Sequence, residues 1–146
     1  MPDAIEALRA LEKYVRTCGI EPKALELIKI RASQTNGCAY CLDMHTKDAR
    51  ERGETEQRIY LLNAWRETQF FTKKERAALA WTEAVTQVSV SHVPDQVYEV
   101  ARQCFDERDL DSTMAIIAIN GWNRLAVSFR SVPGDYEPPK QQLHRE

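Results

Sequence analysis

The stretch NGCAYCLDMHTKDARERG, from Asn36 to Gly53, decides how the chain folds around it. It begins with Asn36-Gly37, a pair that typically ends a helix, and it closes with Gly53, which suits the left-handed conformation found just after a helix. The residues between these two signals, 38–52, have the spacing of apolar and polar side chains that a helix requires. We therefore predict a helix over residues 38–52, preceded by one helix and followed by another.

The rest of the chain is also predicted to be helical. Its apolar residues recur at spacings of three and four, and the one weak strand signal, Val88-Ser89-Val90, is interpreted as a loop. These features predict an all-α, single-domain bundle of about six to seven helices over residues 1–130, followed by an irregular tail over 131–146. Before residues 38–52, we expect a first helix with the apolar stripe Ile5, Leu8, Leu11 and Val15, which ends near Gly19, and a second helix from Pro22 to Asn36. After it, we expect a short helix with an N-cap at Thr55 and a helix over 77–88 that follows a capping box formed by Thr72 and Glu75. The last two helices are expected from Pro94 to about Phe105 and from a cap at Asp111 or Ser112 to Phe129.

The composition restricts the classes of function. The 146 residues carry a formal net charge of -2 with both signs interleaved, which argues against nucleic-acid binding. No apolar run approaches the roughly 18 residues of a membrane helix, and no signal peptide is visible, so we expect a cytoplasmic protein without a membrane partner. In that compartment disulfides are usually transient and catalytic. The four cysteines, Cys18, Cys38, Cys41 and Cys104, therefore need an explanation other than structural crosslinking.

The last predicted helix is apolar over most of its circumference. The run from Met114 to Phe129 is typical of a helix that is buried on several sides. Periodicity leaves two interpretations open: a central core helix of a monomer, or a helix that contributes to contacts between subunits. We predict a homo-oligomer, because a small helical domain has few central positions that are buried from all sides.

The side chains with distinctive chemistry gather on the helix over 38–52. Residues three, four and seven apart share a helix face, so Cys38, Cys41 and His45 are expected to point toward the rest of the protein. The helix N-terminus, the CxxC spacing and a neighbouring histidine each lower a thiol pKa, from about 8.5 toward roughly 3.5–7.5. This favours thiolate attack on an electrophile, followed by closure of a disulfide between the two cysteines. The charged side chains of this helix are expected to face solvent: Asp43, Lys47, Asp48, Arg50 and Glu51.

Two other interpretations of the cysteines stay open. Two cysteines and a histidine are good zinc ligands, but a structural zinc site needs a fourth, and His92 and His144 lie in a predicted loop and the tail. Alternatively, the thiols are small buried hydrophobic groups. The redox interpretation requires no metal and no organic cofactor. The alternative function is a redox switch or a zinc-binding helical oligomer without catalytic turnover.

The run from Glu26 to His45, ELIKIRASQTNGCAYCLDMH, resembles the core of the alkylhydroperoxidase D-like proteins in the carboxymuconolactone decarboxylase superfamily. The signature of these proteins is a glutamate, a CxxC motif and a histidine four residues after it, and all of its parts are present. The likeness continues through GETEQR at 53–58 and reaches NGWNR at 120–124. It therefore covers most of the chain, and it is closest to the short, single-domain branch.

This resemblance implies a thiol-dependent peroxidase that acts on a peroxide substrate and is reduced by a dithiol or a lipoylated protein. It implies a homo-oligomer, commonly a trimer or a hexamer. Cys41 would attack the peroxide, Cys38 would resolve the product, and His45 with a partly buried Glu26 would form the proton relay. The position of His45 one turn beyond Cys41 also favours Cys41 as the nucleophile, because a base that close takes up its proton during attack. The characterised peroxidases of the family have a second histidine between the cysteines, where this chain has Tyr40.

Overall fold

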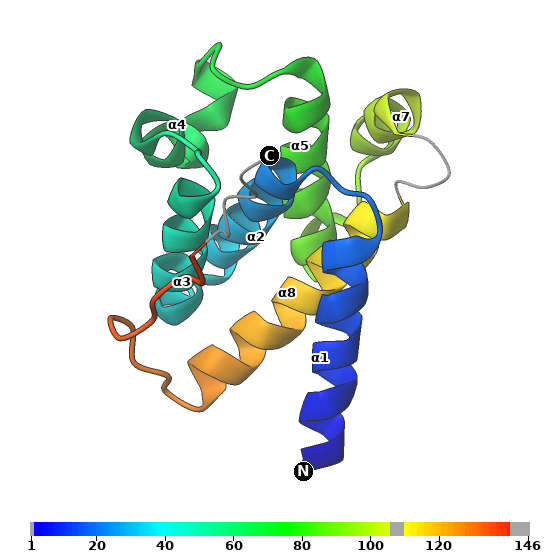
Figure 1. The fold of residues 1–146 in the computed structure, drawn as a ribbon. Coiled ribbons are helices and arrows are strands. Elements are labelled where there is room, and N and C mark those ends of the chain that lie inside the picture. Colours follow the sequence, from blue (N-terminus) through cyan, green and yellow to red (C-terminus); the bar gives the residue numbers. More distant parts are fainter. Residues whose placement is uncertain (1, 106–109, 141–146) are drawn as a thin grey trace.

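The computed structural model describes residues 2–105 and 110–140, and within these ranges the chain forms helices and no strand (Figure 1). The predicted all-α fold is confirmed. Among the described residues, the helices are α1 (Pro2–Thr17), α2 (Pro22–Asn36), α3 (Ala39–Glu51), α4 (Glu56–Leu61), the 3₁₀ helix η1 (Leu62–Glu67), α5 (Lys73–Thr86), α6 (Val88–Ser91), α7 (Asp95–Cys104) and α8 (Leu110–Ser128).

Most helix ends coincide with the signals in the sequence. Gly37 ends α2 at φ 64°, and Gly53 follows α3 at φ 81°, a left-handed conformation that glycine adopts without a steric penalty. The Thr55 side chain accepts a hydrogen bond from the backbone at the start of α4. Before α5, the side chains of Thr72 and Glu75 each accept a hydrogen bond from the other's backbone, which completes the predicted capping box.

Two local predictions are wrong. Val88-Ser89-Val90 was interpreted as a loop, but it forms the one-turn helix α6, because the Gln87 carbonyl accepts hydrogen bonds from the N–H groups of Val90 and Ser91. The last helix was expected to be capped by Asp111 or Ser112. Helix α8 begins at Leu110, so these two residues lie in its first turn, and the residues just before it lie outside the described ranges.

The central element of the bundle is α2. All residues from 25 to 30 are buried, and the helix packs against α3, α5 and α8. Helix α8 packs against α1, α2, α3 and α5, so it is buried on several sides, as its sequence predicts. One narrow stripe remains open, because Ile117, Val127 and, just beyond the end of the helix, Phe129 are exposed by 48%, 48% and 68%. An apolar surface therefore remains on α8 in the single chain.

Two segments at the ends of the chain frame the bundle (Figure 1). Helix α1 packs along α8, and its N-terminal half extends beyond the other helices. Residues 131–140, called the C-terminal segment below, form no helix or strand and lie along α3. None of the helices in the described ranges is both long and apolar enough to span a membrane.

Candidate active site

The site begins at the sharp connection between α2 and α3. The left-handed Gly37 lets the Cys38 N–H reach back to the Ser33 carbonyl at 3.0 Å, which closes α2 and starts α3 immediately. Cys38 is the N-cap of α3, and its Sγ accepts a hydrogen bond from the Cys41 N–H at 3.3 Å. The CxxC motif is thus built into the first turn of the helix, with both cysteines unbridged.

Both thiols are almost completely buried. Cys38 and Cys41 are each 1% exposed and pack with Ala126 of α8 and with Tyr40. Burial, together with the hydrogen bond to Cys38, raises the pKa of Cys41 to about 12. The expected lowering of this pKa is therefore wrong. A helix N-terminus contributes only about 0.3–1 kcal/mol, whereas burial shifts a pKa by up to several units.

A buried amide that was not predicted as a site residue lies beside the Cys41 thiol. Asn123 of α8 is 1% exposed, and its hydrogen bond to Cys41 lowers the pKa of that thiol, against the effect of burial. The amide is held in place from two sides: its Nδ2 donates to Ser33 Oγ at 3.0 Å, and its Oδ1 accepts from Asn36 Nδ2 at 2.9 Å. One signal for it is present in the sequence, because Asn120 and Asn123 are polar residues three apart in the mostly apolar run from Met114 to Val127.

The predicted pair of Glu26 and His45 is formed across two helices. Glu26 Oε2 on α2 lies 3.0 Å from His45 Nδ1 on α3, and their side chains are 2% and 4% exposed. Glu26 is therefore more deeply buried than expected. Burial alone would raise the pKa of Glu26, but the hydrogen bond to His45 and the charges of His45, Lys29 and Arg52 hold it below its usual range. Glu26 is thus a buried carboxylate that fixes one nitrogen of the imidazole.

The imidazole and the thiols share the buried face of α3. Cys41 and His45 are four residues apart, about one helical turn, and both side chains are buried. Because Nδ1 faces Glu26, Nε2 is the remaining nitrogen of the ring. Among the described residues, no hydrogen bond joins His45 to Cys41, so proton exchange between them requires a small movement or a bridging substrate.

A second carboxylate lies beside the imidazole, and its predicted exposure is wrong. Asp48 is 5% exposed, and its Oδ2 is 3.9 Å from His45 Nδ1. Its burial results from the C-terminal segment, whose Tyr136 hydroxyl donates to Asp48 Oδ1 at 2.7 Å. Asp43 and Lys47, half-buried, also contact this segment, while Arg50 and Glu51 are exposed as expected.

The possible metal ligands among the described residues do not include the thiols. In the described part of the chain, the group close enough to hold a cation consists of Glu26, His45 and Asp48, whose ligand atoms lie within 4.8 Å of one another. The guanidinium of Arg52 is already 3.4 Å from Glu26, and the charges of Glu26 and Asp48 also act on Arg16. These cations compensate the carboxylates and oppose a further positive charge, so the group fits a proton relay better than a metal site.

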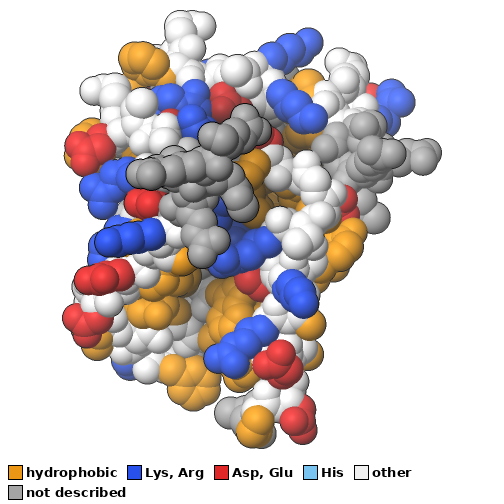
Figure 2. Space-filling model, viewed as in Figure 1, with side chains coloured by type: hydrophobic (Ala, Val, Ile, Leu, Met, Phe, Trp, Pro, Cys, Tyr) orange, Lys and Arg blue, Asp and Glu red, His pale blue; other side chains and the backbone are white. Residues whose placement is uncertain are grey.

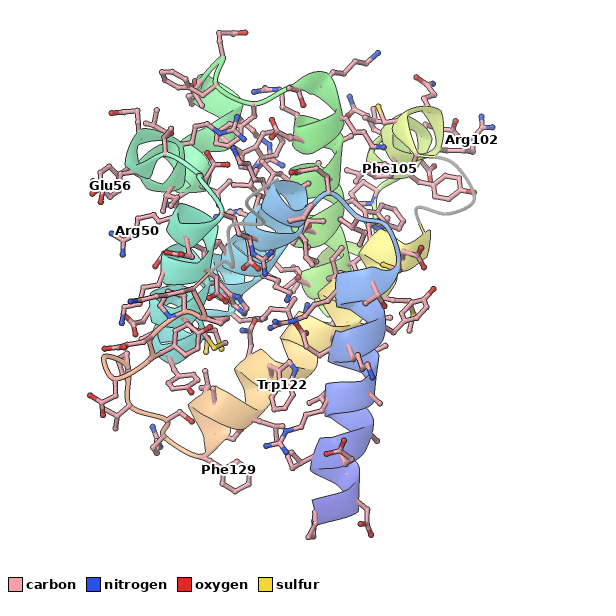
Figure 3. All side chains as sticks on the ribbon, viewed as in Figure 1. Arg50, Glu56, Arg102, Phe105, Trp122 and Phe129 are labelled. Carbon is pink, nitrogen blue, oxygen red and sulfur yellow. The ribbon has the colours of Figure 1, made fainter. Side chains whose placement is uncertain are left out.

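An apolar groove of about 540 Å³ opens over Cys41. Its walls come from α1, α3 and α8, and Figure 2 shows hydrophobic side chains gathered where α3 and α8 approach each other. Figure 3 labels Trp122, which lies on α8, and Phe129, which lies just beyond the C-terminal end of that helix. The groove is lined by Ala4, Ile5, Tyr40, Cys41, Met44, Trp122, Leu125, Ala126, Phe129 and Ser131.

The chain resembles known proteins over most of its length. The chain is 45% identical over 129 residues to the uncharacterized protein YdfG of Bacillus subtilis, with 88% of each chain covered. It superposes with a TM-score of 0.89, at 45% identity, on the crystal structure of a protein of unknown function from Agrobacterium tumefaciens that is proposed to be the antioxidant defence protein AhpD; 93% of this chain and 94% of that chain are covered. A shorter match, 42% identical over 45 residues, joins it to alkyl hydroperoxide reductase AhpD of Acidobacterium capsulatum and covers 31% of this chain and 25% of that protein.

These likenesses confirm the expected resemblance to AhpD-like proteins, a group that includes an enzyme named as a reductase. The model of the carboxymuconolactone decarboxylase family matches residues 2–84, which is more than half of the chain and includes both cysteines, His45 and Glu26. The chain belongs to the carboxymuconolactone decarboxylase family.

Proposed function

We propose that this protein is a thiol-dependent peroxidase with antioxidant function. One observation carries the proposal: two free, buried thiols start α3, and a buried imidazole one turn further along is bound through Nδ1 to a carboxylate. In this proposal Cys41 attacks the peroxide, Cys38 resolves the product, and His45 with Glu26 moves the proton. The likeness to a protein named alkyl hydroperoxide reductase supports the same assignment.

The proposed reaction has two steps. In the first, His45 Nε2 takes the proton from Cys41, the sulfur attacks one peroxide oxygen, and the O–O bond breaks. The leaving alkoxide takes the proton back from the imidazolium and departs as an alcohol, which leaves Cys41 as a sulfenic acid. In the second step, Cys38 sulfur attacks Cys41 sulfur, a disulfide forms, and the sulfenic hydroxyl leaves with the Cys38 proton as water.

The electrostatics of the site explain why a relay is needed. Because the pKa of Cys41 is raised to about 12, the resting group at neutral pH is a thiol and not a thiolate. Glu26, which stays ionised, stabilises the imidazolium that forms when His45 accepts the proton. The hydrogen bond from Asn123 stabilises the developing charge on sulfur. The site thus favours the thiolate while its proton is being transferred.

The partners follow from the same proposal. The apolar groove over Cys41 favours a hydroperoxide with an apolar substituent. A dithiol or a lipoylated protein reduces the disulfide and restores the two thiols. Because this step needs a reducing compartment, we propose that the protein acts in the cytoplasm. The exposed apolar surface of α8 supports assembly of the helical domain, residues 1–130, into a homo-oligomer, a trimer or a hexamer as the family resemblance implies.

The proposal is tested by intact-protein and peptide mass spectrometry before and after one equivalent of peroxide. The expected product is a peptide in which Cys38 and Cys41 have each lost a hydrogen to form one disulfide, and a dithiol should restore both thiols. Zinc content is measured on the same preparation. Stoichiometric zinc with no disulfide and no catalytic turnover of peroxide would reject the peroxidase in favour of a metal-binding protein.

A further inference from the structure

The C-terminal segment is hydrogen-bonded to several side chains of α3 that follow the two cysteines in the chain. Gly134 N–H donates to Asp43 Oδ2 at 3.0 Å, and Lys47 Nζ donates to the carbonyl oxygens of Gly134 and Tyr136 at 3.1 and 3.0 Å. These contacts hold the segment against the outer side of the helix. They also fix the position of the Tyr136 side chain, whose hydroxyl reaches inward to Asp48.

Asp48 connects the segment to the proposed relay. One of its oxygens, Oδ1, accepts from Tyr136 at 2.7 Å, and the other, Oδ2, lies 3.9 Å from His45 Nδ1. The same Nδ1 is hydrogen-bonded to Glu26 Oε2 at 3.0 Å. The imidazole therefore faces two carboxylates: one bonded to it, and one near enough for its charge to change the proton affinity of the ring.

The Tyr136 hydroxyl has two effects on Asp48. Its hydrogen bond compensates part of the negative charge, and it holds Oδ1 in place, with Oδ2 at 3.9 Å from His45 Nδ1 while Glu26 Oε2 is hydrogen-bonded to that nitrogen. Burial, together with the hydrogen bond and charge of Asp48, raises the pKa of Tyr136 above its usual range, so the hydroxyl remains a donor at neutral pH.

We propose that Tyr136 is a positioning residue: by holding Asp48 at a distance from His45, the C-terminal segment sets the proton affinity of the imidazole. This role deepens the proposed peroxidase and rests on it for its functional meaning. An imidazole with too high a proton affinity would already be protonated at neutral pH and could not accept the Cys41 proton. Tyr136, which lies outside the predicted helical domain, thus helps His45 to act as the base.

Five other charged side chains surround this site, and a substitution at Tyr136 leaves all of them in the chain. They come from α1, α2, the end of α3 and the C-terminal segment, and each lies near Glu26 or Asp48 or acts on one of them electrostatically. They are Arg16, Lys29, Glu51, Arg52 and Lys140. A comparison between the protein and a variant at Tyr136 therefore isolates the effect of one hydroxyl.

The test is a pH titration of the histidine side chains by NMR, with ¹³C-labelled imidazole, in the protein and in Tyr136→Phe. The His45 resonance is the one that disappears in His45→Gln. In Tyr136→Phe, Asp48 loses its donor and becomes free to approach Nδ1, which favours the imidazolium. The His45 midpoint should therefore move to higher pH, by roughly half a unit to one unit, while that of His92 stays unchanged.

Two controls separate this role from a general effect of losing a hydroxyl. Tyr60 donates to Glu56 Oε2 at 3.1 Å on exposed α4, so Tyr60→Phe removes a bond of the same kind and should leave His45 unchanged. In an Asp48→Asn background, adding Tyr136→Phe should produce no further change. A His45 midpoint that stays the same or falls in Tyr136→Phe, or that rises equally in Tyr60→Phe, overturns the inference.

The titration needs no turnover, which keeps the two proposals separable. A protein that forms no disulfide with peroxide would defeat the proposed function and still give a valid His45 titration. If both proposals hold, the acid limb of the pH profile of kcat/KM moves to higher pH in Tyr136→Phe by the same amount as the NMR midpoint. An active enzyme with an unmoved acid limb would remove Tyr136 from the relay.

Discussion

Replacing Glu26 with glutamine tests whether the buried carboxylate supports proton transfer. Glutamine keeps an acceptor for His45 Nδ1–H, so the change removes mainly the charge at 3.0 Å from the ring. Hydrogen bonds to charged groups contribute about 1.5–3 kcal/mol and neutral ones about 0.5–1.5 kcal/mol, so the imidazolium loses about 1–2 kcal/mol. This corresponds to a fall in kcat/KM of roughly 5- to 30-fold. Lys29 and Arg52, left without their anionic neighbour, act in the same direction.

The assay is stopped-flow consumption of peroxide by the reduced protein in a single turnover, which isolates the first chemical step from reduction by the dithiol. Glu56→Gln is the matched control, because Glu56 is an exposed carboxylate with its own partners, Arg50 and Tyr60. We expect this control to stay within twofold of the unmodified protein. A folded Glu26→Gln variant that also stays within twofold would refute the relay.

Three further outcomes are expected. Asn123→Leu should slow the first oxidation about tenfold at pH 7, measured by the same stopped-flow assay, because the Cys41 thiolate loses its donor; an unchanged rate would remove Asn123 from the site. Because the folded state lowers the pKa of Glu26 from its usual value of 4.5, its stabilising contribution is complete above that pH and is lost as pH falls through the folded pKa. Urea unfolding should therefore show a smaller loss of stability in acid for Glu26→Gln, and equal losses would contradict this. Ile117→Asp places a charge on the exposed apolar surface of α8 and should dissociate the oligomer, as measured by sedimentation. An unmodified protein that already sediments as a monomer of 16.8 kDa would exclude assembly.

Local signals in the sequence were sufficient to predict most of the helices. Gly37 and Thr72 act within a few residues of themselves, and their effects on α2 and α5 do not depend on the rest of the molecule. The pairing of Glu26 with His45 was expected only through the family resemblance. Nothing in the pattern around Glu26 distinguishes a buried carboxylate from a solvated one.

The errors at the candidate site, the exposure of Asp48 and the pKa of Cys41, have a common physical origin, because each depends on contacts between distant segments. Asp48 lies only about 60° around α3 from His45, so periodicity alone cannot decide whether it is exposed. Its burial depends on Tyr136, which is 88 residues further along and carried by a segment predicted only as irregular. The pKa of Cys41 was misjudged for the same reason. The helix N-terminus is visible in the sequence, while the enclosure by Ala126 and Asn123 of α8 is not.

The most direct test of the account is to trap sulfenic acid in the two single-cysteine variants of the motif, after one equivalent of peroxide, with a dimedone-type reagent and peptide mass spectrometry. We predict that Cys38→Ser accumulates the adduct on Cys41, because the nucleophile is intact and its resolving thiol is gone. The Cys41→Ser variant should form none on Cys38 and should lose turnover. An adduct on Cys38 in Cys41→Ser, together with none on Cys41 in Cys38→Ser, would contradict the account and reverse the roles of the two thiols.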